Sequence, residues 1–228
     1  IYGKKVEGTK LPDHDYRVRG VKISGNEIIS AAEAIILDDA VDCVISENTV
    51  SKSDGNCVKG ANLIDIVRSK KTTVLSNSVS GSSGDGIRIS GGKIFEVSDN
   101  TVSNSTGSGI CLINSVSESE ISGNTVKKSE QCGIIVKNSC ESITIDGNSV
   151  VSAKASGISI SDKTVDGISC KDNSVSQSAR GICITAQSKA DVSGSTFSEN
   201  DRNVAVGEGS YCTLSAPSGV AASEITEN

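Results

Sequence analysis

Seven residues in the N-terminal part of the chain have side chains that could perform acid–base chemistry or bind a cation. They are the carboxylates Asp38, Asp39, Asp54 and Asp85, the cations Lys59 and Arg88, and the single histidine, His14. We take Arg88, Lys59 and His14 as candidate catalytic residues and the four aspartates as candidate substrate-binding residues.

Two reactions of acidic sugars would use such a set. β-Elimination at a uronate needs a base for the C5 proton and a cation, such as Lys59, Arg88 or an Asp-bound Ca²⁺, to stabilise the developing dianion. Hydrolysis needs two carboxylates across the scissile bond. A third interpretation is that these are solvated loop charges, because Asp beside Gly, as at Asp54 and Asp85, is ordinary turn chemistry. No residue set is assigned to a resident metal, and Ca²⁺ is the one cofactor that the elimination reaction would call for.

A repeat must position these residues. Eight copies of a short pattern, apolar ends around a polar turn, occur at Ile23–Ile28, Ile45–Val50, Val74–Val79, Val97–Val102, Ile121–Val126, Ile145–Val150, Cys170–Val175 and Val192–Phe197. Seven copies have Asn at the same place, and the eighth has Ser195. The turn residues recur every 22 to 29 positions. A period in this range predicts a solenoid in which each unit buries its apolar face against its neighbours.

A second repeated block predicts short strands. An apolar–x–apolar pair, usually led by Gly, follows most turns, as at Gly86–Ile89 and Gly181–Ile184. Period-2 patterning without a helical run favours coils made only of strands and turns. The outward x positions are Ile36, the irregular second coil around Lys59, Arg88, Cys111, Ile135, Ser159, Cys183 and Ala205. The long interval from Asn48 to Asn77 suggests an insertion near Gly60–Lys71, where function could be grafted.

The repeated Asn has a physical explanation. A sharp bend between strands requires a left-handed backbone conformation, which Asn tolerates better than β-branched residues. Its amide can also bond to the Asn of the next coil, which predicts an Asn ladder along the rod.

With these features, the stretch from about Val18 to Val206 resembles the right-handed parallel β-helix proteins of the pectate-lyase-like superfamily. The resemblance implies an all-β, right-handed parallel β-helix solenoid of about eight coils. Lyases, hydrolases, epimerases, adhesins and phage tailspikes share that fold, so the resemblance does not choose a reaction. The stretch Pro12-Asp13-His14-Asp15 loosely resembles the Asp-Pro-His motif of mannuronan epimerases, although its order differs and it precedes the first clear coil.

Domain boundaries follow from where the period begins and ends. We expect a cap or the remnant of a preceding coil at 1–17, the β-helix at 18–210, and a closing strand with a linker-like tail at 211–228. The chain has neither an initiator Met nor a secretory leader, so we expect it to be part of a longer protein.

Composition restricts the partners. A net charge of −6 and a pI near 4.9 argue against nucleic acid, and no apolar run is long enough to span a membrane. Three Tyr, two Phe and no Trp offer little stacking surface for sugars.

The eight cysteines contain no C-x-x-C pair. We expect structural thiols, with Cys43, Cys132 and Cys170 facing inward and Cys111 and Cys183 outward.

These observations favour a rigid, secreted or cell-surface module that is structural or associated with a polysaccharide. The alternative is a polysaccharide lyase or C5-epimerase that acts on acidic glycans.

Overall fold

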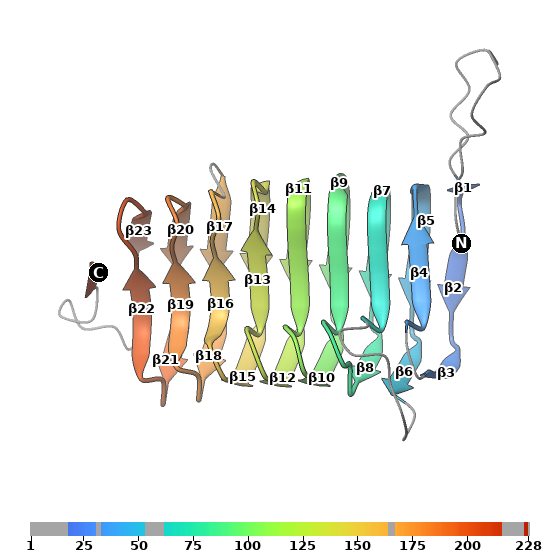
Figure 1. Cartoon of the computed structure of the whole chain (residues 1–228), viewed down its shortest axis with the longest axis horizontal. Helices are drawn as coiled ribbons and strands as arrows, with labels where there is room; N and C mark the ends of the chain where they lie inside the picture. The colour runs from blue at the N-terminus through green and yellow to red at the C-terminus, as the bar shows by residue number, and fades with distance from the viewer. Residues whose placement is uncertain (1–17, 31–32, 53–61, 164–166, 216–225, 228) are drawn as a thin grey trace, which may run out of the picture.

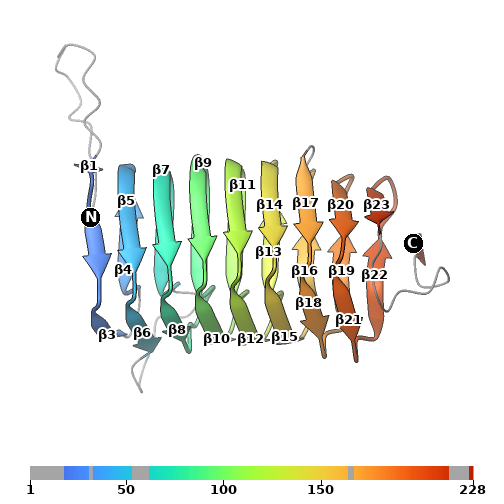
Figure 2. The ribbon, with the colours of Figure 1, turned by 180° about the vertical axis from the view of Figure 1, so that it is seen from behind.

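The chain forms a rod of stacked parallel coils (Figure 1). The computed structural model describes residues 18–30, 33–52, 62–163, 167–215 and 226–227. Every strand pairing in this part of the chain is parallel and joins equivalent residues of successive coils, for example Val126 with Val150. Figure 1 and the reverse view in Figure 2 both show the coils following one another along the long axis in sequence order.

Three faces surround the core, and each receives one stretch of strand from most coils. Face A consists of β4 (Ile35–Asp38), the first parts of β7 (Ile64–Leu75), β9 (Ile87–Ser98) and β11 (Ile110–Ser122), and β13 (Ile134–Lys137), β16 (Ser156–Ile160), β19 (Arg180–Ile184) and β22 (Arg202–Val206). Face B consists of β1 (Val18–Arg19), β2 (Lys22–Ser24), β5 (Ala40–Ser46), the later parts of β7, β9 and β11, and β14 (Glu141–Asp146), β17 (Ile168–Lys171), β20 (Lys189–Ser193) and β23 (Tyr211–Ser215). Because β7, β9 and β11 run continuously from one face to the next, faces A and B belong to one sheet, which has sixteen strands when β24 (Thr226–Glu227), paired with β22, is included.

Face C is a separate eight-stranded sheet. Its strands are β3 (Glu27–Ser30), β6 (Thr49–Lys52), β8 (Ser78–Ser80), β10 (Thr101–Ser105), β12 (Thr125–Ser129), β15 (Ser149–Ala153), β18 (Ser174–Ser176) and β21 (Thr196–Ser198). Its central inward position is Val in the coils from β6 to β18 and Phe197 in β21, and all of these side chains are buried.

The core continues along the whole rod because each coil places Ile, Val or Leu at the same inward positions. Ile87, Ile110, Ile134 and Ile158 are fully buried and stack directly in register on face A. Burial of such side chains is the main favourable contribution to folding.

Glycine is required at the corner where face C turns into face A. A Cβ on Gly133 would lie 2.2 Å from Cγ1 of Val150 and 2.7 Å from the carbonyl oxygen of Gly157. Gly109 and Gly157 meet the same two kinds of neighbour in the coil that follows each of them. The glycine that leads the strand pattern therefore serves close packing of the coils rather than an unusual backbone angle.

The predicted Asn ladder is present. The amide of Asn100 donates to Oδ1 of Asn124 at 3.0 Å, and the amide of Asn124 donates to Oδ1 of Asn148 at 2.9 Å. The same pattern joins Asn26, Asn48, Asn77, Asn100, Asn124, Asn148 and Asn173 in sequence order. Ser195 ends it, accepting the backbone N–H of Asn173 at 3.3 Å.

The explanation given for the Asn in terms of backbone conformation was wrong. The left-handed residue is the one before each Asn, for example Asp99 with φ of 55° and Gly123 with φ of 63°. The Asn itself is selected for its amide, which satisfies groups in two neighbouring coils at once.

The second coil also differs from the prediction. Residues 64–71, assigned to an insertion, belong to the long strand β7. Its outward residue in the x series is Asp65, which pairs in register with Ile36 on one side and Arg88 on the other. Lys59 is therefore not the x residue of this coil, and it lies outside the described residues. The error arose because Ile64-Asp65-Ile66 lacks the leading glycine.

Cysteine positions follow the prediction with one exception. Cys43 and Cys170 belong to the core cluster, and Cys111 and Cys183 lie outside it in the outward x series. Cys132 was predicted to face inward, but it is absent from the core cluster although only 7 % exposed. The strict alternation fails there because Gly133 and Ile134 both face the core at the corner. The seven described cysteines are free thiols.

Candidate functional site

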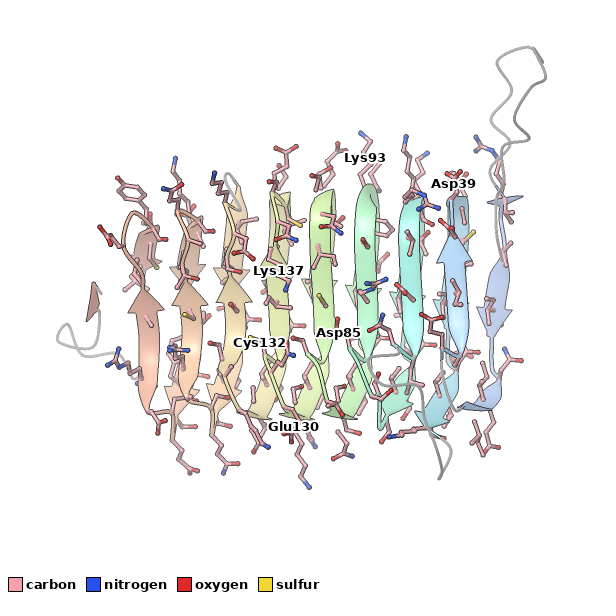
Figure 3. All side chains as sticks on the ribbon, in the orientation of Figure 1. Asp39, Asp85, Lys93, Glu130, Cys132 and Lys137 are labelled. Atoms are coloured by element: carbon pink, nitrogen blue, oxygen red, sulfur yellow. The ribbon has the colours of Figure 1, made fainter. Side chains whose placement is uncertain are left out.

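The outer surface of face A carries three rows of side chains, one residue per coil. Row one lies at the corner with face C and contains Glu33, Asn62, Asp85, Ser108, Cys132, Ser156, Arg180 and Arg202. Row two contains Ile36, Asp65, Arg88, Cys111, Ile135, Ser159, Cys183 and Ala205. Row three contains Asp38, Val67, Ser90, Ile113, Lys137, Ser161, Thr185 and Gly207. Figure 3 shows Asp85, Cys132 and Lys137 on this face, with Asp39 and Lys93 at its upper rim and Glu130 at its lower rim.

An ion pair occupies row two of the second and third coils. Nε of Arg88 donates to Oδ1 of Asp65 at 3.0 Å, and Nη2 donates to Oδ2 at 2.8 Å. The Asp65 side chain is 5 % exposed and the Arg88 side chain 31 %. The hydrogen bond to Asp65 raises the pKa of the Arg88 guanidinium above its ordinary value. This two-bond geometry is the strong form of a charge-assisted hydrogen bond, and it commits Arg88 to a structural partner.

Hydrogen bonds from row one lead from the second coil to the fourth. The Asn62 side chain accepts the backbone N–H of Asp85 at 2.9 Å, and the Asp85 carboxylate accepts the backbone N–H of Ser108 at 2.7 Å. The amide of Asn62 also lies 3.4 Å from Oδ2 of Asp65. Asp85 and Asp65 thus both flank Arg88, and Asp85 also contributes to raising its pKa.

The other predicted site residues do not join this cluster. Asp38 accepts a hydrogen bond from Arg68 of β7, which lies beyond row three. Asp39 occupies the following turn with φ of 54°. Asp38 and Asp85 do not lie in adjoining coils, because the second coil lies between them. Asp54 and His14, like Lys59, lie outside the described residues.

Two thiols on this face, Cys111 and Cys132, are poor nucleophiles. Burial raises the pKa of the Cys111 thiol far above its ordinary value, and the neighbouring Asp85 carboxylate raises it further. Burial likewise raises the pKa of Cys132. A thiol must ionise to attack, so these side chains act as small apolar groups that fill the surface between larger neighbours.

Three basic residues on face A were missed by the sequence analysis. Lys137 lies in row three of the fifth coil, and Arg180 and Arg202 lie in row one of the seventh and eighth. Charged candidates had been taken only from the N-terminal part of the chain. The signal was nevertheless present, because Arg180 directly precedes the Gly-led strand pattern and Lys137 follows it.

The described residues include no group of three or more His, Cys, Asp or Glu arranged to hold a metal ion. In the same part of the chain, no helix could cross a membrane. The described residues thus provide no preformed set of ligands for the Ca²⁺ suggested for an elimination reaction.

Comparisons with known proteins agree on the fold. A family described as "right handed beta helix region" matches residues 14–201. The A-module of Azotobacter vinelandii mannuronan C-5 epimerase AlgE6 is similar with a TM-score of 0.67 and 12 % identity, over 89 % of this chain and 58 % of that module. DFA-IIIase from Arthrobacter chlorophenolicus A6, without its lid, gives a TM-score of 0.61 and 14 % identity, over 100 % of this chain and 63 % of the enzyme.

The enzymatically active domain of bacteriophage CBA120 tailspike protein 2 gives a TM-score of 0.58 and 11 % identity, over 92 % of this chain and 41 % of the domain. A search of curated proteins finds no match. At these identities the structural likeness concerns the fold, and this chain spans well under two thirds of the epimerase module and of the tailspike domain.

Proposed function

This chain belongs to the right-handed β-helix family, and we propose that it is a rigid glycan-associated module that binds a polysaccharide along the outer rows of face A without cleaving it. We also propose a secreted or cell-surface location, where such polymers occur. The nearby folds include an epimerase of a polysaccharide and a tailspike enzyme. Their functions come to this chain only as support for the glycan association.

The ion pair between Arg88 and Asp65 is the observation that favours binding over catalysis. Arg88 is the one described cation among the predicted catalytic residues, and two of its three guanidinium nitrogens, Nε and Nη2, donate to Asp65. Asp85, the second carboxylate that flanks Arg88, accepts a backbone N–H of the next coil. A lyase or epimerase would need a free base and an available cation at the same sugar. The described residues contain the two groups, but both form hydrogen bonds to other residues of the rod.

Binding to face A can be tested with a charge-matched pair of variants in one coil. Ile135 of β13 and Thr144 of β14 are both partly exposed and point outward, from faces A and B respectively. We expect Ile135→Glu to weaken glycan binding in calorimetric titrations and Thr144→Glu to leave it unchanged. Equal effects of the two variants would place binding elsewhere.

A separate assay tests the alternative function, which is catalysis. Incubation with acidic glycans, with and without Ca²⁺, should give no ultraviolet-absorbing unsaturated product and no inversion at C5 by NMR. Turnover of an acidic glycan by the wild-type chain would establish the lyase or C5-epimerase instead.

A further inference from the structure

Charge is unevenly distributed along face A. In coils one to three, the rows carry Glu33, Asp38, Asp65 and Asp85 against a single cation, Arg88. In coils four to eight, the same rows carry Lys137, Arg180 and Arg202 and no carboxylate. The chain as a whole has a net charge of −6. This segment of the three rows therefore carries only positive charges on a protein whose net charge is negative.

Two of these cations lie directly beside each other. Arg180 and Arg202 are in-register neighbours on β19 and β22, and both are exposed. In the described part of the chain, neither forms an ion pair with a carboxylate. Like charges opposed on adjacent strands destabilise a sheet. An anion held between the two guanidinium groups would remove that repulsion.

Lys137 belongs to the same surface, two coils before Arg180. It is partly exposed in row three of the fifth coil, and Figure 3 shows it on this face. It too forms no ion pair with a described residue. With about 4.8 Å between coils, Lys137 and Arg180 are separated by roughly 10 Å along the rod, and Arg180 and Arg202 by roughly 5 Å.

We propose that Lys137, Arg180 and Arg202, the basic strip, form a binding subsite for the carboxylates of an acidic glycan that lies along coils five to eight. This inference rests on the proposed function and names its substrate class. The guanidinium groups can each hold a carboxylate through two hydrogen bonds, whereas the lysine supplies a point charge. Between the cations, the partly exposed hydroxyls of Ser161 and Thr185 in row three can contact sugar hydroxyls.

The surface suits a glycan better than a nucleic acid. None of the residues in the three rows is aromatic. Single-stranded nucleic acids bind largely by stacking bases on aromatic side chains, and duplexes require many more phosphate contacts than three cations provide.

The test compares a defined oligouronate with its neutral, carboxyl-reduced counterpart by isothermal titration calorimetry at low salt. We expect wild-type protein to bind the acidic ligand about tenfold more tightly, and Arg180→Gln/Arg202→Gln to abolish that preference. The matched control is Lys127→Gln/Lys171→Gln. It removes the same charge from exposed lysines of β12 and β17, on faces C and B, and should retain the preference. Thermal melting would verify that both variants are folded.

The outcomes separate this inference from the proposed function. Equal affinity for acidic and neutral ligands, with face A still required, would overturn the basic strip and leave the proposed function standing. An absence of binding to either ligand would overturn both. Tight binding of a short single-stranded DNA, with the same loss in the arginine variant, would overturn the glycan as the occupant.

Discussion

Replacing Asn124 by valine should strongly destabilise the rod, because its amide joins three coils. Nδ2 donates to the carbonyl oxygens of Val97 at 2.8 Å and Ser122 at 3.0 Å, and to Oδ1 of Asn148 at 2.9 Å. Oδ1 accepts the backbone N–H and the amide of Asn100 at 2.9 and 3.0 Å. Asn124 is 0 % exposed, so water cannot replace these bonds.

The expected loss is about 3–5 kcal/mol. A buried hydrogen bond contributes about 1 kcal/mol net, and a buried partner left unsatisfied costs about 1–3 kcal/mol. Valine would break five contacts at once, but Oδ1 of Asn148 would still accept the backbone N–H of residue 124. The smaller figure applies if the coils relax toward one another, and the larger if they do not.

Two variants calibrate the result. Asn26 is the exposed first member of the ladder and donates only to Ser24 and Asn48 among the described residues. Asn26→Val should therefore cost about 1 kcal/mol or less. Asn124→Ser should fall between the two, because Ser195 occupies this place naturally in the eighth coil.

Urea unfolding followed by circular dichroism measures these differences. Repeat proteins can lose two-state unfolding. Free energies of unfolding are therefore compared only when the m value, their slope against urea concentration, equals that of the wild type. Equal and small shifts for Asn26→Val and Asn124→Val would refute a structural role for the ladder.

Three further changes should alter stability. Gly133→Ala should cost at least about 2 kcal/mol in urea unfolding, because the new methyl group would overlap Cγ1 of Val150 in a packed core. Arg88→Ala should cost about 3 kcal/mol by the same assay, since it leaves the Asp65 carboxylate buried without its partner. Burial raises the pKa of the Cys170 thiol, so above the unfolded value of about 8.5 only the unfolded chain releases that proton. Stability should therefore be full below about pH 8.5 and fall above it, by about 1.4 kcal/mol per pH unit for each such thiol, and Cys170→Ala should flatten that fall.

Each of these has a matched control. Gly147 has φ of 62° and no neighbour within 4 Å of an added Cβ, so Gly147→Ala should show only backbone strain of about 1–2 kcal/mol. Arg68→Ala removes an exposed arginine from Asp38 and should cost less than about 1 kcal/mol. Burial raises the pKa of Cys212 to about 11, so the fall in stability caused by that thiol should begin near pH 8.5 and level off above about pH 11, and Cys212→Ala should remove it. A stability curve that stays flat through this alkaline range would contradict the thiol linkage.

The repeat was predictable from the sequence because every coil packs against its neighbours in the same way. Inward apolar residues, the corner glycine and the ladder Asn must occupy equivalent positions to stack, so their identities recur with the period. Val126 and Val150, for example, recur 24 positions apart and pair in register. Even the outward residue Arg88 could be placed correctly, since alternation fixes its side of the strand.

The prediction failed where inward and outward side chains no longer alternate along the strand. At the corner, Gly133 and Ile134 both face the core, which turns Cys132 outward against expectation. In the second coil, the residue before Ile64 is Leu63 rather than glycine, so Asp65 and its ion pair with Arg88 were overlooked. Such pairs join residues 23 positions apart, and only the register between coils reveals them.

The rigidity of the rod makes the uneven charge of face A relevant to ligand binding. The Asn ladder and the stacked glycines fix the coil spacing, so the backbone positions from which the cations of coils five to eight project are fixed. In coils two and three, Asp65 already neutralises Arg88, and Asp85 is stabilised by the N–H of Ser108. The acidic half is thus internally satisfied, whereas Arg180 and Arg202 have no described anionic partner. A preorganised, unsatisfied charge on a rigid scaffold loses little entropy when a ligand arrives, and that is the physical reason to seek the ligand at the basic end.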